Sequence, residues 1–425
     1  MERAGKDNHN YFMNRSPAWK WYICGLLLLA TMINYMDRQT LSNAAAAVKA
    51  EFRLDDLQYG NLETAFGLAF GVGSLVFGFL CERFSLRWMY PVVLGGWSLA
   101  GLFSSWAADY HQFMAARVML GLFEAGHWPC ALKTTFRLLQ PNERMMGNSV
   151  LQSGASIGAI ITPRLVLWLS QGHPQGWRFA FQAIALTGVV WIVLWMVSFR
   201  LQKTTTEEGA QTTENDSASL LPIIVSKKFW AIALLLVGIQ IPWQIIRAWL
   251  PLFLQEGRGY DALSTANFVS VYYIATDVGC LLAGILSMQL VKRFALSSHM
   301  AKRRIFNVSA VLASLTICIP WLGKSSMLLG LLLVVGAASL AMFPCYYSFV
   351  QELSTEHVSR LTGIFSMWVW LTTSPMQSLF GWLRVHLGSY DPALALTGLT
   401  PWLGVIAMKL LWDTQKEDNM DAGVR

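Results

Sequence analysis

Residues 21–38 read Trp-Tyr-Ile-Cys-Gly-Leu-Leu-Leu-Leu-Ala-Thr-Met-Ile-Asn-Tyr-Met-Asp37-Arg38, and uncharged residues continue from Gln39 to Val48. An apolar run of this length can cross a bilayer as a helix, which takes about 20 residues. A charge near the bilayer centre costs roughly 2.5–3.5 kcal/mol, so the charged pair favours a path for a proton, an ion or a substrate. Alternatively, Asp37 and Arg38 sit at the outer end of the helix and mark the interface.

The composition predicts a membrane protein rather than a soluble domain. The chain is 54% hydrophobic and 13% charged with a mean hydropathy of +0.42, whereas soluble domains are about 25% charged. The pI near 9.1 does not indicate nucleic-acid binding, because the basic residues are spread over loops. No cleavable signal peptide is expected. The six cysteines form no CxxC pair and are interpreted as small core residues.

Hydropathy predicts an all-α integral membrane protein with twelve transmembrane helices in two six-helix halves. The spans are 19–46, 57–80, 88–107, 111–133, 146–170, 177–199, 229–254, 265–291, 305–322, 326–350, 360–386 and 391–412. Most Lys and Arg residues lie on the side of the N-terminus, which places both termini in the cytoplasm. The opposite side carries only Lys49, Arg53, Arg178, Arg258, Lys324 and Arg384.

A polar stretch divides the spans six and six. Residues 202–219 are rich in Thr, Glu, Ser, Asn and Gly with no apolar period, so they predict a flexible linker. The expected organisation is a cytoplasmic tail (1–18), an N-terminal half (19–199), a cytoplasmic linker (200–228), a C-terminal half (229–412) and a second tail (413–425). This outline is typical of secondary transporters, whose binding site lies near the midplane between repeats.

The loop after the second span carries a glycine–acid–arginine spacing. Gly78, Glu82, Arg83 and Arg87 are the residues concerned, and ordinary inside-loop charges would explain the arginines but not this spacing. Glycine permits close helix approach, and the charges can lock the cytoplasmic helix ends as a gate. The spacing resembles the signature loop of the major facilitator superfamily, with Glu82 and Ser85 as departures from its usual Asp and Gly.

Further segments resemble one branch of that superfamily, the anion:cation symporter family, over essentially the whole chain. They are 34–38 (Asn-Tyr-Met-Asp-Arg), 117–129 (Arg-Val-Met-Leu-Gly-Leu-Phe-Glu-Ala-Gly-His-Trp-Pro), 141–144 (Pro-Asn-Glu-Arg), 156–163, 229–234, 248–253 and 277–280. The last three are similar to its hexuronate transporters. The resemblance implies that Asp37 and Glu124 are protonation sites and that Arg38 contacts an anionic substrate.

The residue spacing is compatible with those roles. Arg117 and Glu124 are two helical turns apart and share a face. Arg117 would favour the charged form of Glu124 and burial the neutral form, so conformation can control proton release. A structural ion pair is the alternative role for Glu124. His127 lies one turn beyond it, either on the proton path or as a hydrogen-bonded helix contact.

Arginines inside two other spans are candidate anion ligands. Arg164 and Arg247 lie at a depth similar to that of Asp37, and arginine binds a carboxylate through two parallel hydrogen bonds. Snorkelling to the outer interface is the rival interpretation for each. Glu63 can pair with either arginine, and Asp277 is either a helix-packing contact or a proton site.

Neutral side chains complete the expected substrate site, because sugar hydroxyls need hydrogen-bond partners and a flat apolar face. The candidates are Asn34, Tyr35, Gln152, Trp368 and Gln377. Aromatic residues in spans are more often packing or interfacial residues, so single assignments are weak. Phe70 replaces a tyrosine of a related sugar-acid carrier, which puts the exact substrate in doubt.

The expected function is proton-coupled uptake of an organic anion, most simply a hexuronate or related sugar acid, by alternating access. No nucleotide-binding motif, metal cluster or nucleophile–base arrangement is found, so no enzyme activity, cofactor or metal is expected. The expected partners are a small anion, protons and the lipid bilayer, with the protein a monomer in the inner membrane. Two alternatives stay open: a proton-driven exporter, disfavoured by the in-span arginines, and a non-transporting ligand sensor.

Overall fold

A computed structural model describes residues 17–139, 141–172, 175–200, 221–294, 296–353 and 358–412. All twelve predicted spans are helical, and no β-strand occurs in these ranges, so the all-α prediction is confirmed. The predicted N-terminal tail apart from Pro17 and Ala18, the whole predicted C-terminal tail and the linker residues 201–220 lie outside the described part of the chain.

Seven helices form the first six spans. They are α2 (Pro17–Phe52), α3 (Asp56–Arg83), α4 (Leu86–Trp106), α5 (Tyr110–Glu124), α6 (His127–Leu138), α7 (Pro141–Ser170) and α8 (Gly176–Arg200). Some of these helices are preceded by a polar N-cap residue, whose side chain accepts a hydrogen bond from a backbone N–H of the first turn. Ser85 accepts a hydrogen bond from the backbone N–H of Arg87, and Asp109 accepts one from that of Gln112.

The last six spans are built in the same way, with a short helix α9 (Leu221–Val225) before them. They consist of α10 (Lys227–Leu252) with the π-helix η1 (Phe253–Gly257), α11 (Ala262–Phe294), α12 (Ser298–Ala313) with the 3-10 helix η2 (Ser314–Trp321), α13 (Ser326–Leu353), α14 (Val358–Thr373), α15 (Pro375–Leu387), α16 (Asp391–Thr397) and α17 (Pro401–Leu411). Ser226 and Ser297 cap α10 and α12.

Five predicted spans contain a break or a change of helix type rather than one continuous α-helix. The most relevant break separates α5 from α6 at Ala125 and Gly126, directly after Glu124. A Cβ on Gly126 would lie 2.8 Å from Val93 and 2.9 Å from Phe77, so only glycine fits between α3 and α4 there. The span 360–386 is interrupted at Ser374, because Pro375 starts a new helix.

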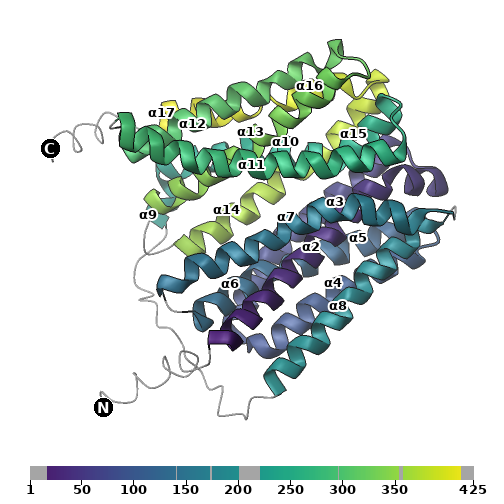
Figure 1. The fold of residues 1–425 in the computed structure, drawn as a ribbon, viewed down its shortest axis with the longest axis horizontal. Helices are drawn as coiled ribbons and strands as arrows, with labels where there is room; N and C mark the ends of the chain where they lie inside the picture. The colour runs from purple at the N-terminus through teal and green to yellow at the C-terminus, as the bar shows by residue number, and fades with distance from the viewer. Residues whose placement is uncertain are drawn as a thin grey trace. The chain divides into compact units, whose positions relative to one another are not determined.

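The chain divides into two compact units. One comprises residues 1–52 and 65–218, and the other comprises 53–64 and 219–425, so the first two turns of α3 belong with the later helices. Within the first unit α2 runs along α7, and within the second α11 runs along α13 (Figure 1).

Glycines allow these close helix pairs. A Cβ on Gly154 of α7 would collide with the Leu28 carbonyl of α2, and one on Gly279 of α11 would collide with the backbone of Ala337 in α13. Without large side chains the helices pack backbone to backbone, which is how membrane helices gain van der Waals contact. Gly279 is therefore a helix-packing position.

The helices differ in how much of their apolar surface the protein covers. Eight helical stretches of the described residues are long and apolar enough to cross a membrane. The most apolar window is 72% buried in the α10–η1 span but only 17% buried in α11, so α10 is central and α11 peripheral in the second unit. Exposed α11 side chains such as Leu281 and Leu282 would face lipid.

Candidate functional site

The first charged cluster lies inside the first compact unit and centres on Arg38. We call Asn34, Asp37, Arg38, Arg117 and Glu124 the Arg38 cluster. All five are at least 95% buried. They come from the middle of α2 and from α5, so charges that the sequence separates by more than 80 residues meet inside the bundle.

Arg38 forms an ion pair with Glu124. Its Nη2 and Nε atoms donate to the same oxygen, Oε2, at 2.8 and 3.2 Å. Nη2 also lies 3.4 Å from Oδ1 of Asn34, one turn away on α2. A charge-assisted hydrogen bond between buried groups is strong, so the pair holds Arg38 in a defined position.

Asp37 and Arg117 are close enough to join this pair electrostatically. The charges of Glu124 and Arg117 both act on the Asp37 carboxyl group, which is 1% exposed. Its Oδ2 atom has no hydrogen-bond partner among the described residues. The sequence suggested that Arg117 approaches Glu124; the ion pair that the structure gives Glu124 is with Arg38.

Aromatic rings enclose the two arginines of the cluster. The Arg38 guanidinium carbon lies 5.4 Å from the ring centres of Tyr35 and Phe66 and 5.0 Å from that of Phe70, and Arg117 lies 4.5 Å from Phe66. Such contacts stabilise a desolvated guanidinium by up to about 2 kcal/mol. Phe66 was not a candidate, because a phenylalanine in an apolar span carries no signal that it faces a charge.

His127 makes the hydrogen bonds of a helix contact. Thr31 Oγ1 donates to the carbonyl of Leu27 at 3.0 Å, so it accepts from Nε2 of His127 at 3.1 Å. Nδ1 then accepts from the Tyr90 hydroxyl at 3.0 Å. We assign the neutral Nε2–H tautomer on this network. With both nitrogens bonded in this way, the geometry favours the packing interpretation of His127 over a place on the proton path.

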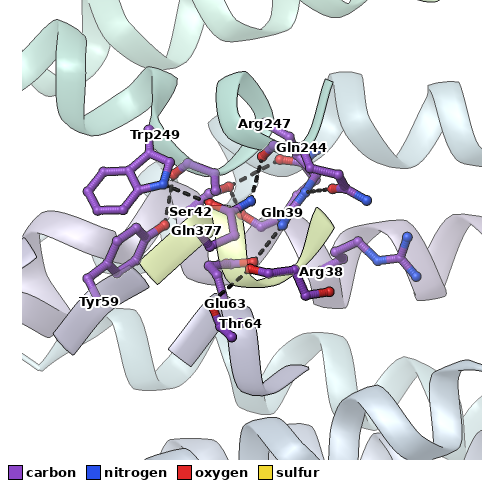
Figure 2. Close-up of polar contacts among 12 residues, drawn as sticks. Arg38, Gln39, Ser42, Tyr59, Glu63, Thr64, Gln244, Arg247, Trp249 and Gln377 are labelled. Carbon is purple, nitrogen blue, oxygen red and sulfur yellow. Dashed lines mark hydrogen bonds and ion pairs between the residues drawn. The ribbon is translucent and has the colours of Figure 1, made fainter. Parts of the chain in front are cut away.

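The second charged cluster lies inside the second compact unit. We call Tyr59, Glu63, Gln244, Arg247 and Gln377 the Arg247 cluster; Figure 2 shows their polar contacts. Arg247 Nη2 lies 2.5 Å from Glu63 Oε2, and Arg247 Nε donates to Gln244 Oε1 at 2.7 Å. The Arg247 side chain is 4% exposed, so it is buried in this pair rather than extended towards a surface. Of the two partners open to Glu63, the structure pairs it with Arg247.

Gln377 fixes the neighbouring helices around the pair. Its Oε1 atom accepts from the Trp249 indole at 2.8 Å, and its Nε2 atom donates to the backbone carbonyl of Gln244 at 3.0 Å. Tyr59 donates to the carbonyl of Ala248 at 2.8 Å. Gln377 therefore positions α10 against α15 in this conformation. Gln244 was missed from the sequence, although its position three residues before Arg247 was a usable signal.

A small cavity adjoins the Arg247 cluster. Its volume is about 10 Å³, enough for one water molecule, so no space of substrate size is open there in this conformation. Besides Glu63, Gln244, Arg247 and Gln377, it is lined by Trp370, Thr373 and Ser374. The lining combines an arginine, amides, hydroxyls and an indole, the groups that a carboxylated sugar requires.

Other predicted substrate residues lie apart from these contacts. Gln152 and Arg164 occupy exposed positions on α7, and Trp368 is half-buried in α14 with its ring 5.4 Å from that of Trp230. Asp277 is half-buried on α11.

The predicted gate residues lie at the end of α3 and the start of α4. A Cβ on Gly78 would meet nothing within 4 Å, so no close helix approach is seen there in this conformation. The Glu82 side chain lies outside the described part of the chain, and Arg83 is exposed. Arg87 stacks 5.5 Å from the Trp88 ring. Ser85, an unusual residue for the signature loop, has a structural explanation because it caps α4.

The fold and the buried charges define a multi-pass membrane transporter built from helical bundles. Residues 27–374 match the model of the Major Facilitator Superfamily, which covers more than half of the chain. The chain therefore belongs to the Major Facilitator Superfamily.

Several relatives of the chain are named as transporters of sugar acids. The chain is 24% identical to the hexuronate transporter of Escherichia coli (strain K12) over 411 residues, covering 93% of this chain and 94% of that one. It is also 24% identical to the galacturonate transporter of Dickeya chrysanthemi over 307 residues, covering 69% and 88%. The fold is similar to a bacterial homologue of the human lysosomal transporter Spinster, with a TM-score of 0.75, 17% identity and coverage of 92% and 96%.

Proposed function

We propose that this protein is a proton-coupled symporter that takes up a sugar acid, most simply a hexuronate, by alternating access. The sugar-acid transporters among its relatives support the substrate class. The observation that carries the proposal is the buried Arg38–Glu124 ion pair with Asp37 beside it. It combines an anion ligand with two groups that can accept protons.

The pair suggests how one proton and one anion move together. Glu124 occupies the Nη2 and Nε edge of Arg38, which is the edge a substrate carboxylate would use. Protonation of Glu124 removes its negative charge and frees Arg38 for the anion. Binding the anion and the proton together leaves the net charge of the site unchanged, which avoids an uncompensated charge in the bilayer.

Asp37 supplies a second protonatable group. It adjoins Arg38 in α2 and is affected by the charges of Glu124 and Arg117. In the proposed cycle the outward-open state has Asp37 and Glu124 protonated with the anion on Arg38. The halves then rock to open the cavity inward, and deprotonation restores the Arg38–Glu124 pair and expels the anion.

The remaining features follow the expectations from sequence. We propose a monomer in the inner membrane with both termini in the cytoplasm, and a cytoplasmic linker at residues 200–228 between the halves. Exposed Arg83 and the signature-loop residues Glu82 and Arg87 would act at the cytoplasmic helix ends. No observation favours export or ligand sensing.

The test is uptake of radiolabelled hexuronates into proteoliposomes with and without an inward proton gradient. The proposal expects accumulation above equilibrium only with the gradient and loss of accumulation when a protonophore is added. Neutral hexoses serve as the matched substrate control, since they lack the carboxylate. Equal uptake with and without the gradient would reject proton coupling, and hexose uptake at the hexuronate rate would reject anion selectivity.

A further inference from the structure

The two helix ends that meet at the loop between α11 and α12 carry a group of basic residues. The sequence contains no Asp or Glu between Asp277 and Glu352, so this group has no acidic neighbour along the chain. Two of its members lie in the last turn of α11 and three in the second turn of α12. They are Lys292, Arg293, Lys302, Arg303 and Arg304.

Three of these five side chains are exposed positive charges. Lys302 pairs with Glu352 at 2.7 Å, and Arg303 is half-buried. Lys292, Arg293 and Arg304 are exposed and form no ion pair with any residue that the structure describes. We call these three residues the α11–α12 patch. Because a short loop joins the two helices, which also pack against each other (Figure 1), the three charges lie at the same end of the second unit.

The α11–α12 patch continues an apolar face of α11. Leu281, Ile285 and Met288 are 46–68% exposed, and their spacing of four and three residues places them on one side of the helix. Lys292 is the next position of the same series. Phe294, which ends α11, is 68% exposed. A ligand that covers both parts therefore needs a negative head and an apolar tail.

We propose that the α11–α12 patch binds the phosphate headgroup of an anionic phospholipid whose acyl chains lie along the exposed face of α11. Basic residues beside membrane helices attract anionic lipids, and lysine and arginine both bind phosphate. Free phosphate would leave the apolar face uncovered. A second copy of the chain, packed through the same face about a two-fold axis, would bring two basic patches together. This inference does not depend on the substrate or on proton coupling.

The first test is a lipid titration of the purified full chain in a neutral detergent. Phosphatidylglycerol should raise the melting temperature of wild type, and phosphatidylcholine with the same acyl chains should not. The triple variant Lys292→Gln/Arg293→Gln/Arg304→Gln should bind phosphatidylglycerol roughly 20- to 100-fold more weakly, as expected for losing three basic residues at a membrane surface. An unchanged affinity would overturn the inference.

A matched triple variant separates the patch from the net charge of the protein. Arg137, Lys227 and Lys409 are exposed residues on three other helices, α6, α10 and α17. Their exchange to Gln removes the same total charge and should leave the affinity for phosphatidylglycerol at the wild-type value. An equal loss in both triple variants would mean that the lipid responds to overall charge, which contradicts a site at the α11–α12 loop.

Two further measurements exclude the other occupants. Inorganic phosphate should neither raise the melting temperature nor compete with phosphatidylglycerol, and competition at similar concentrations would assign the patch to a free anion. Native mass spectrometry should show monomers that retain anionic lipid. Dimers that are lost in the Lys292→Gln/Arg293→Gln/Arg304→Gln variant would assign the face to a second copy and overturn the inference.

Photo-crosslinking locates the lipid on wild type, so the inference stays testable if the neutral triple variant does not fold. A phosphatidylglycerol with a photoreactive group in its acyl chain should label peptides of α11, and labelling should fall when unlabelled phosphatidylglycerol is added in excess. The charge-keeping variant Lys292→Arg/Arg293→Lys/Arg304→Lys should be labelled like wild type. Labelling mainly on other helices would overturn the assignment.

Discussion

Two nitrogen atoms of Arg38, Nε and Nη2, donate hydrogen bonds to the same carboxylate oxygen of Glu124. Only a guanidinium side chain can present two donors in this way. Lysine would keep the charge at this position, but its ammonium group is a point charge and cannot present two parallel donors. The side chain also lies against aromatic rings that suit a flat cation. Arg38 is therefore the residue whose chemistry is least replaceable in the first unit.

We predict that Arg38→Lys weakens sugar-acid binding about 10- to 100-fold, corresponding to the roughly 1.5–3 kcal/mol of a charge-assisted hydrogen bond. A binding isotherm on purified protein measures it. Lys49→Arg, a conservative exchange in the same helix away from the cluster, is the control and should bind as wild type. Unchanged affinity in Arg38→Lys would remove Arg38 from the substrate site.

The two buried acids of the Arg38 cluster should be needed for proton coupling but not both for substrate exchange. We predict that Asp37→Asn and Glu124→Gln each abolish accumulation driven by a proton gradient, because neither side chain can release a proton. Counterflow exchange, which needs no net proton movement, survives in at least one of them. Accumulation at the wild-type rate in both variants would show that the protons travel elsewhere.

At the scale of helices, close packing depends on a few positions without side chains. Gly279 of α11 lies against the backbone of Ala337 in α13, whereas Gly284 of the same helix has open space around its Cα. Both residues look alike in sequence, a glycine in an apolar span. Only the neighbouring helix distinguishes them.

This difference predicts opposite results for the same substitution. Gly279→Ala should lower the free energy of unfolding by about 1–3 kcal/mol, as overpacking does. Gly284→Ala should be neutral or stabilise the helix by up to about 1 kcal/mol, the difference in helix propensity. Thermal unfolding in detergent measures both, and equal melting temperatures would contradict the α11–α13 packing.

The ends of α12 and α13 are held by a surface ion pair. Partial burial raises the pKa of Glu352, but hydrogen bonds from His299 and Lys302 outweigh it and leave the pKa below its ordinary value. Because the folded pKa is lower than the unfolded one, this contribution to stability is present above the unfolded pKa. It is lost as the pH falls through the folded value.

We therefore predict that Glu352→Gln destabilises the protein slightly at pH 7, by about 0.2–1 kcal/mol as for exposed ion pairs. The difference in melting temperature from wild type should shrink as the pH is lowered below the ordinary glutamate range near 4.3. Lys409→Gln, a charge change on α17 without this partner, should show no such convergence. A difference that persists unchanged at acidic pH would contradict the assignment.

For the whole molecule, the distribution of Lys and Arg predicts the orientation in the membrane. An epitope tag at either terminus should resist protease in intact spheroplasts and become accessible after lysis. A tag inserted beside Gly323, in the loop between η2 and α13, should be accessible in both preparations. Protease access to the terminal tags in intact cells would reverse the proposed topology.

The sequence by itself determined the class of the molecule and most of its helices. Apolar runs of about 20 residues leave no alternative to helices in a bilayer, because the backbone must satisfy its own hydrogen bonds. The charges at Asp37, Arg38 and Glu124 were evident for the same reason: they are costly in a span unless they are used. Helix breaks inside spans were missed. The glycine at the break after α5, Gly126, is required because the side chains of Val93 and Phe77 on neighbouring helices leave no room for a Cβ there.

Only the tertiary structure decided which charges are partners. Sequence spacing relates residues on one helix, so it joined Arg117 to Glu124 and could not choose a partner for Glu63. The ion pairs Arg38–Glu124 and Glu63–Arg247 join residues separated by 86 and 184 positions. Their formation depends on which helices pack together and on how each is rotated, and this follows from the packing of the whole bundle rather than from any local pattern.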